Sequence, residues 1–231
     1  MTGNRAVMLA PLAAALAGVV AVLAVIVVPA GAEPGQTRIK DYEQARKLFW
    51  RHLYNEGGET LYCGRSFGSG YNAGINIEHV FPMAWVTNAL KCGRRKQCRE
   101  TSDRFNRIEA DLHNLYPART EINDARGAMR YGEIPGERRW EGACDFEVDD
   151  QRRAVEPRPA ARGEIARAMF YMSETYGLII FDRQGALLKR WHRKDPVSAH
   201  ERQRNDAIDK IQGTRNMYID KPELVDALQF Q

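Results

Sequence analysis

The chain has 231 residues and a formal net charge of +4. Its length allows one domain with a real core and excludes two domains of ordinary size. The positive charge is compatible with an anionic partner but does not identify one.

The N-terminus carries an export signal. A polar stub holding Arg5 precedes a long Ala/Val/Leu run, and Ala30 and Ala32 fit a small-x-small cleavage rule. We predict a secretory signal peptide over residues 1–32. The apolar run is also long enough to span a bilayer, so an uncleaved membrane anchor remains an alternative. In both cases residues 33–231 form one exported domain, periplasmic or secreted.

Two short strands and a helix are predicted in the first half of this domain. A helix over 41–56 ends at a Gly-Gly pair, and the stretch GINIEHVF predicts a strand that Pro82 ends. Good N-cap residues at 101–103 begin a second helix, which leads into a strand around 113–116 with a boundary at Pro117. A short amphipathic helix follows in RTEINDARGAMRYG.

The second half is richer in helix. CDFEVDD predicts a strand near the surface, and 162–176 is a helix with Ile165, Met169, Met172 and Tyr176 on one stripe, closed by Gly177. GALLKRWHRK and HERQRNDAIDKIQG predict two more helices. The fold class is therefore α+β, a helix-rich single domain.

Four cysteines, Cys63, Cys92, Cys98 and Cys144, lie in the exported part. An even count in an oxidising compartment predicts two disulfides. The close pair Cys92 and Cys98 would clip a loop, which leaves Cys63 to pair with Cys144. A structural zinc site is the alternative, although the sequence has no C-x-x-C pair.

The clipped loop is basic. It reads KCGRRKQCR and holds no acidic residue. Its cationic side chains are those of Lys91, Arg94, Arg95, Lys96 and Arg99. We expect them to contact an anionic partner.

Glu78 and His79 stand together at the end of the first predicted strand. A neutral imidazole can deprotonate water, and a carboxylate can bind a hard cation such as Mg²⁺. Neighbouring residues of a strand point to opposite faces, so the two can share a site only if the strand ends or bends there. On pattern alone, a solvated surface pair remains an alternative.

The other histidines have simpler interpretations. His52, His192 and His200 are expected at the surface. His113 is either a second site residue or a buried histidine bonded to backbone.

Six ordered blocks resemble one known family. YCG, IEHVFPMAW, GRRKQC, EADLHNLYPARTEINDARG, ARGEIARAMFYM and IQG occur in the order found in the bacterial endonuclease I family. These are periplasmic and secreted non-specific nucleases with a ββα-metal (His-Me finger) site. The resemblance covers about 62–213, most of the domain.

The resemblance implies a role for each matching residue. His79 would be the general base and Arg95 the arginine that holds the phosphate. Glu78 and Asn123 would bind Mg²⁺, with Mn²⁺ or Ca²⁺ left open. Asn114 would pin the loop between the two strands. His113, the residue before it, is grouped with Asn114 as a residue that surrounds the site without binding the metal.

The chain also departs from the family pattern. Members often have eight cysteines, whereas this chain keeps the four that match two of the family's pairs. The segment 63–77 and the loop 92–98 look shorter than usual, which puts part of the DNA-contacting surface in doubt.

The function implied is an exported Mg²⁺-dependent endonuclease that cuts DNA without sequence preference and leaves 5′-phosphate ends. RNA is left open as a second substrate. We expect a monomer that needs no small-molecule cofactor. Contact with a membrane is expected only if the N-terminal segment is not cleaved. Two alternatives are an exported nucleic-acid-binding or uptake protein without catalysis, and a structural disulfide-stapled domain.

Overall fold

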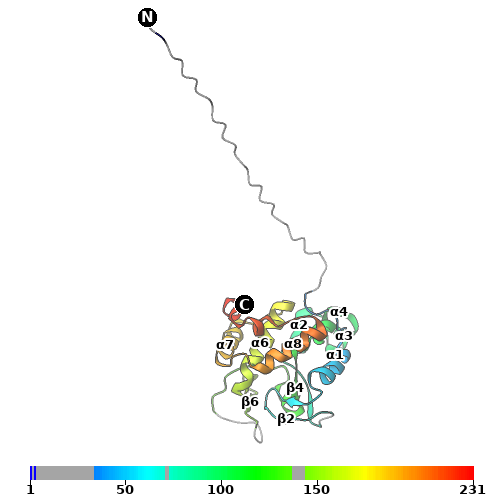
Figure 1. The fold of residues 1–231 in the computed structure, drawn as a ribbon. Helices are drawn as coiled ribbons and strands as arrows, with labels where there is room; N and C mark the ends of the chain where they lie inside the picture. The colour runs from blue at the N-terminus through cyan, green and yellow to red at the C-terminus, as the bar shows by residue number, and fades with distance from the viewer. Residues whose placement is uncertain (2, 4–33, 71–72, 137–143) are drawn as a thin grey trace. The chain divides into compact units, whose positions relative to one another are not determined.

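The computed structural model describes residues 1, 3, 34–70, 73–136 and 144–231, which Figure 1 draws as a coloured ribbon. The predicted signal peptide and its cleavage point at Ala32 therefore lie almost wholly outside the described residues. The fold reported below is that of the unit Glu33–Gln231. Within the described ranges, no helix is both long enough and apolar enough to cross a membrane.

Two antiparallel strands and a helix form the centre of the first half. Strand β3 (Ile75–His79) pairs with β4 (Leu115–Arg119), and α5 (Thr120–Arg126) follows β4 directly. The register places His79 opposite Leu115. The predicted order of two short strands and a helix is confirmed.

The boundary predicted at Pro117 is wrong, because this proline lies inside β4 opposite Ile77. Its carbonyl oxygen accepts a hydrogen bond from the Leu61 backbone N–H at 2.8 Å. The carbonyl and the nitrogen of one strand residue point to the same side, so the proline nitrogen faces away from β3. No ladder hydrogen bond to β3 is lost, and the strand continues.

Three helices and a 3₁₀ turn lie between β3 and β4 in the chain. They are α2 (Met83–Leu90), α3 (Arg95–Thr101), α4 (Asp103–Glu109) and η2 (Leu112–Asn114). The Ser102 hydroxyl caps α4 by accepting from the Phe105 N–H at 3.1 Å, as its N-cap position predicts. The connection from β3 to β4 contains the basic loop, and β4 then pairs with β3.

The predicted N-terminal helix is present, but only its first part is α-helical. Asp41 caps α1 (Tyr42–Leu48), which continues as a π-helical turn, η1 (Phe49–Leu53), before Gly57. The two-residue strands β1 (Gly58–Glu59) and β2 (Ser66–Phe67) then pair with each other.

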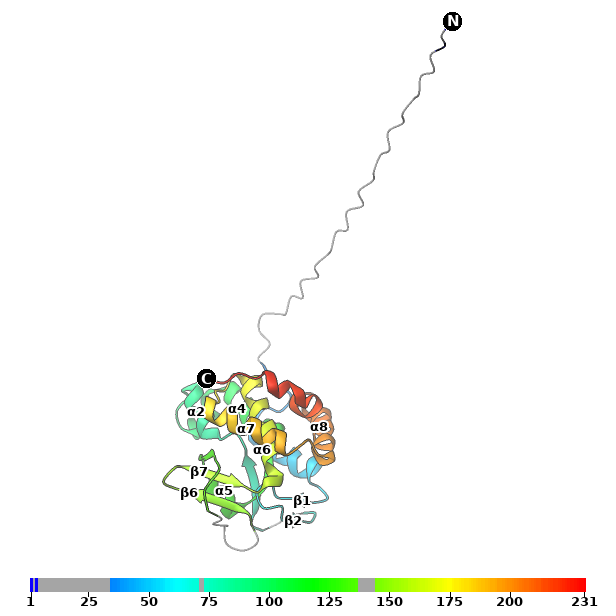
Figure 2. The same cartoon turned by 90° about the vertical axis from the view of Figure 1, so that its left-hand side faces the viewer.

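A three-stranded sheet and the C-terminal helices form the rest. The strands β5 (Arg130–Tyr131), β6 (Phe146–Asp149) and β7 (Ala154–Pro157) lie in the order β5-β7-β6, with β6 beside α5 (Figure 2). The helical segments are α6 (Pro159–Tyr176), α7 (Asp182–Lys194), α8 (Ala199–Gln212), α9 (Met217–Asp220) and η3 (Pro222–Ala227).

Helix α6 is the centre of the main core. Its predicted apolar stripe, Ile165, Met169, Met172 and Tyr176, is buried, and Gly177 ends the helix with a left-handed φ of +67°. The prediction of the surface for His192 is wrong. Its ring lies 3.2 Å from Arg167 Nη1 and 3.1 Å from the Pro222 carbonyl oxygen, because α7 turns this face toward α6. His52 and His200 are exposed as predicted.

Both predicted disulfides are present. Cys63 is bonded to Cys144 and Cys92 to Cys98. Because all four sulfurs are used in these bonds, the zinc alternative is excluded.

Candidate active site

A pocket of about 640 Å³ lies at the end of β3. Five parts of the chain line it: the strand end with Glu78 and His79, the start of α1 with Tyr42, the first half of α2 with Met83, the helix α5, and the basic segment 91–99. The lining residues from α5 and the basic segment include Arg94, Arg95, Arg99, Asn123 and Arg126. Residues far apart in the sequence therefore meet here.

Glu78 and His79 reach the same pocket because β3 ends at His79. The next residues leave the strand and bond to η2: Val80 donates its N–H to the Asn114 carbonyl oxygen at 3.0 Å. This is the change of direction that the two adjacent side chains need in order to share a site.

The ring of His79 is buried and has a defined tautomer. Its Nε2 lies 3.0 Å from the backbone carbonyl oxygen of Glu109. A carbonyl oxygen can only accept, so Nε2 carries the hydrogen and, in the neutral ring, Nδ1 carries the lone pair. Burial, and then the charge of Arg95, lower the pKa of His79 to about 3. The imidazole is therefore neutral, and one nitrogen is available as a base.

Two side chains hold the carboxylate of Glu78 at the same oxygen. The Tyr62 hydroxyl donates to Oε1 at 2.5 Å, and Arg126 Nη1 lies 3.2 Å from the same atom. Neither contact uses Oε2. Burial raises the pKa of Glu78, and the neighbouring Arg126 charge opposes this rise.

Asn123 projects from α5 into the same pocket. Its amide nitrogen donates to Asn76 Oδ1 at 2.9 Å and to the Ile77 carbonyl oxygen at 3.2 Å. These two bonds orient the amide and leave its oxygen as the end that could bind a cation. Its predicted partner Glu78 lines the same pocket.

The donors present fit a hard cation. Within the described residues, no group of three or more His, Cys, Asp or Glu side chains is arranged to hold a metal. A carboxylate oxygen of Glu78 and the amide oxygen of Asn123 are nevertheless the ligand types that Mg²⁺ accepts while keeping several waters. The donor set is compatible with Mg²⁺ and poor for a thiolate-loving metal.

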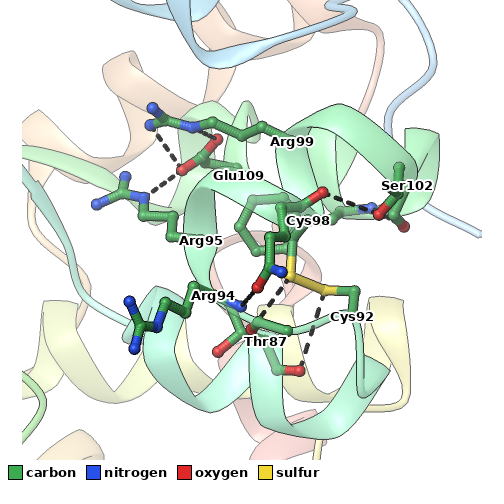
Figure 3. The surroundings of a disulfide bond; sticks show 12 residues. Thr87, Cys92, Arg94, Arg95, Cys98, Arg99, Ser102 and Glu109 are labelled. Carbon is green, nitrogen blue, oxygen red and sulfur yellow. Dashed lines mark hydrogen bonds and ion pairs between the residues drawn. A yellow bond between two sulfur atoms is a disulfide. The ribbon is translucent and has the colours of Figure 1, made fainter.

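The five cations of the basic segment divide into two groups. Arg94, Arg95 and Arg99 line the pocket, whereas Lys91 and Lys96 are exposed outside it. Figure 3 shows Arg95 and Arg99 turned toward Glu109, beside the disulfide of Cys92 and Cys98. The short disulfide thus fixes the segment from which these arginines project.

Asn114 and His113 are placed differently. Asn114 is fully buried, accepts from the Phe81 N–H at 2.6 Å and donates to the Phe81 carbonyl oxygen at 3.0 Å, so it holds the chain just after His79. His113 does not line the pocket: its Nε2 lies 3.1 Å from the Thr214 carbonyl oxygen and its ring packs on Tyr171. This geometry favours the backbone-bonded interpretation of His113.

Four residues near the site are absent from the sequence-based prediction. Tyr62 and Arg126 hold Glu78, Glu109 contacts His79 and two arginines, and the Tyr42 ring lies 5.1 Å from the His79 ring. Tyr62, Glu109 and Arg126 lie inside the ordered sequence blocks, which was the only available signal. Nothing in the local pattern marks Tyr42.

Comparisons with known proteins identify the family of the chain. The family model described as Endonuclease I matches residues 37–223. An extracellular deoxyribonuclease of Aeromonas hydrophila is 36% identical over 202 residues, covering 77% of this chain and 87% of that protein. A periplasmic deoxyribonuclease of the same organism is 39% identical, covering 73% and 81%. Endonuclease-1 of Buchnera aphidicola subsp. Acyrthosiphon pisum is 36% identical, covering 76% and 71%.

Proposed function

Because the chain belongs to the endonuclease I family, we propose that it is an exported endonuclease that hydrolyses DNA phosphodiester bonds with a divalent cation and the base His79. The cuts are expected to leave 5′-phosphate and 3′-hydroxyl ends. Export is supported by relatives named extracellular and periplasmic deoxyribonuclease and by two disulfides, which persist in oxidising compartments.

The observation that carries the proposal is the orientation of His79. Its Nε2–H is bound to a backbone carbonyl, so Nδ1 is the atom that can take a proton from water. Ring and backbone are both fixed, because Asn114 holds the following residues. A positioned general base of this kind contributes about 10²- to 10⁴-fold to a rate.

Glu78 and Asn123 are the proposed ligands of the cation, preferentially Mg²⁺. When bound, such an ion stabilises the negative charge that develops on the phosphate and on the leaving oxygen. Tyr62 and Arg126 orient the Glu78 carboxylate through Oε1 and so present Oε2 to the pocket. The two hydrogen bonds from the Asn123 amide nitrogen do the same for its oxygen.

Arg95 is the proposed phosphate-binding residue. Its guanidinium lines the pocket, and the planar fork of arginine matches two phosphate oxygens. Lys91, Arg94 and Lys96 offer further contacts to the nucleic-acid backbone. Phosphate contacts carry no sequence information, so we expect cleavage without sequence preference. The same contacts exist in RNA, which is therefore a second substrate to test.

The test is a plasmid-nicking assay on the oxidised protein with Mg²⁺, with EDTA, and with the variant His79→Ala. We expect no cleavage in EDTA and a loss of at least about 100-fold with His79→Ala, while DNA binding is kept. His52→Ala is the matched control, since His52 is exposed and does not line this pocket.

Two results would contradict the proposal. Cleavage by His79→Ala at the wild-type rate would show that His79 is not the general base. A well-folded protein that binds DNA but does not cut it in Mg²⁺, Mn²⁺ or Ca²⁺ would favour an exported binding protein instead.

A further inference from the structure

The carboxylate of Glu109 is buried beside the site although it is neither the base nor a proposed metal ligand. Glu109 is the last residue of α4, and its side chain has no exposed surface. It accepts from Arg95 Nε at 2.5 Å and from Arg99 Nε at 2.7 Å (Figure 3). A buried carboxylate is stable only when it is paired, so these contacts fix the two arginines relative to α4.

The two arginines bind this carboxylate in different ways. Arg99 uses both Nε and Nη2, the latter at 2.9 Å, so its fork is occupied by Glu109. In the part of the chain that the structure describes, the contact between Arg95 and Glu109 uses Nε alone. Both guanidinium groups also lie over the Tyr42 ring, 5.7 Å and 5.4 Å from its centre. Arg95 thus keeps its two terminal nitrogens for a ligand in the pocket.

The same glutamate also contacts the base. Its backbone carbonyl oxygen receives the Nε2–H of His79 at 3.0 Å. The carbonyl and the carboxylate of one residue are separated by a few covalent bonds. A single residue therefore sets the position of His79 relative to Arg95.

We propose that Glu109 is a positioning residue that aims Arg95 at the phosphate beside which His79 activates water, and that Arg99 fixes Glu109 rather than contacting substrate. This inference rests on the proposed function. It revises the expectation for Arg99, which the sequence grouped with the nucleic-acid contacts. The competing explanation is an ion pair that only joins α3 to α4.

The test is a double-mutant cycle on kcat/KM with Glu109→Gln and Arg95→Ala. Glutamine keeps the backbone carbonyl and nearly the same volume but removes the charge. Arg95 and Arg99 side chains are 44% and 41% exposed, so water can solvate both when the carboxylate is lost. We therefore expect Glu109→Gln to fold.

In the wild-type background Arg95→Ala should lower kcat/KM by about 100-fold, as loss of a donor to developing charge does. In the Glu109→Gln background the same change should cost less than about fivefold, because Arg95 is no longer aimed. Glu109→Gln alone should lower kcat more than it raises KM. An ion pair that only stabilises the fold predicts the full 100-fold factor in both backgrounds.

Glu201→Gln is the matched control. The pair of Arg167 and Glu201 is equally close, at 2.6 and 2.8 Å, is fully buried, and does not line the pocket. Its loss should lower stability, yet leave the Arg95→Ala factor at its wild-type size.

An unchanged Arg95→Ala factor in Glu109→Gln, with His79-dependent cleavage intact in the wild type, would overturn this inference alone. Absence of His79-dependent cleavage in the wild type would overturn the proposed function and this inference with it. If circular dichroism shows that Glu109→Gln is unfolded, the cycle is run with Glu109→Asp, whose shorter side chain keeps the charge but cannot reach both arginines. A full-size factor there would equally overturn the inference.

Discussion

At the scale of single residues, Tyr62 connects a disulfide to the proposed metal ligand. It precedes Cys63 in the chain, and its hydroxyl donates to Glu78 Oε1 at 2.5 Å. Its hydroxyl also lies 2.9 Å from that of Tyr131, which accepts from Arg126. The orientation of Glu78 therefore depends on a buried hydrogen-bond network, in which the loss of one member leaves the others without a partner in a low-dielectric environment.

Tyr62→Phe should weaken divalent-cation binding by about 10-fold or more, because an outer hydrogen bond that orients a ligand is removed. Calorimetric titration with Mn²⁺ in the absence of DNA measures this without relying on activity. Tyr176→Phe is the control, since the Tyr176 hydroxyl makes an equally short bond, 2.5 Å to Asp111 Oδ2, that does not touch the pocket. Equal Mn²⁺ affinity in both variants and the wild type would contradict the role of Tyr62.

His113 predicts how stability depends on pH. Burial lowers the pKa of His113 from its ordinary value of 6.5 to about 4, against the opposing charge of Asp111. Between these values the unfolded chain binds a proton that the folded chain does not, so stability falls as pH decreases from 6.5 to 4. The contribution of His113 to this loss of unfolding free energy is on the order of 3 kcal/mol.

Urea unfolding at pH 7 and at pH 4.5 checks this expectation. His113→Gln keeps a donor for the Thr214 carbonyl and should reduce the difference in unfolding free energy between the two pH values. His52→Gln, at an exposed position, should leave the difference as in the wild type. A pH dependence that His113→Gln does not alter would assign the acid sensitivity to other groups.

At the scale of elements, the short disulfide holds α3 against the end of α2. Cys92 and Cys98 lie six positions apart in the sequence, whereas Cys63 and Cys144 lie 81 positions apart. Chain-entropy reasoning assigns about 2 kcal/mol to the short bridge and about 4 kcal/mol to the long one. The short bridge lies beside Arg95, so its loss should also affect the arginines of the site.

Removing the short bridge with Cys92→Ala and Cys98→Ala should therefore reduce the unfolding free energy by about 2 kcal/mol and also lower kcat/KM several-fold at 25 °C. Removing the long bridge with Cys63→Ala and Cys144→Ala should reduce it by about 4 kcal/mol. Guanidinium unfolding and initial cleavage rates separate the two quantities. Wild-type cleavage by the protein without its short bridge would show that the fold alone positions the arginines.

The elements also show what sequence can and cannot predict. The strand of Glu78 and His79 follows from its apolar alternation, and helix α6 from its stripe and Gly177, because these signals are local. The continuation of β4 through Pro117 was not predictable, since it depends on which way that nitrogen faces relative to β3. The burial of His192 was missed for the same reason: its partners, Arg167 and Pro222, are distant in sequence.

The site divides in the same way. His79, Glu78, Asn123 and Arg95 could be identified because the family resemblance names their positions, and the structure brings all four to one pocket. The sequence could not identify Glu109 as a residue that contacts both His79 and Arg95. A glutamate at the end of a helix is ordinary in sequence, and only tertiary structure places His79 on its carbonyl and Arg95 on its carboxylate.

At the scale of the whole molecule, the positive charge should govern encounter with DNA. The formal net charge is +4, and exposed lysines flank the pocket arginines in the basic segment. Each phosphate contact releases about one counterion, so three or more contacts imply a fall in kcat/KM of at least about 10-fold between 50 and 200 mM salt.

The double variant Lys91→Asn and Lys96→Gln should reduce the slope of log(kcat/KM) against log[salt] by up to roughly two, with little change in kcat. Asparagine is chosen because Lys91 has a left-handed φ of +52°. Initial rates on sub-saturating plasmid at several salt concentrations measure the slope. A rate independent of salt would show that electrostatic attraction does not limit cleavage.

The connectivity of the two disulfides has a further consequence for oxidative maturation. Four cysteines allow three pairings, and the bond of Cys92 and Cys98 is nested inside the loop that Cys63 and Cys144 close. Short loops close with the smallest entropy cost, so the inner bond should form first. Once it exists, the remaining two thiols can pair only with each other. The newly exported chain should therefore reach its native cross-links by oxidation alone, with little need for a disulfide isomerase to reshuffle them.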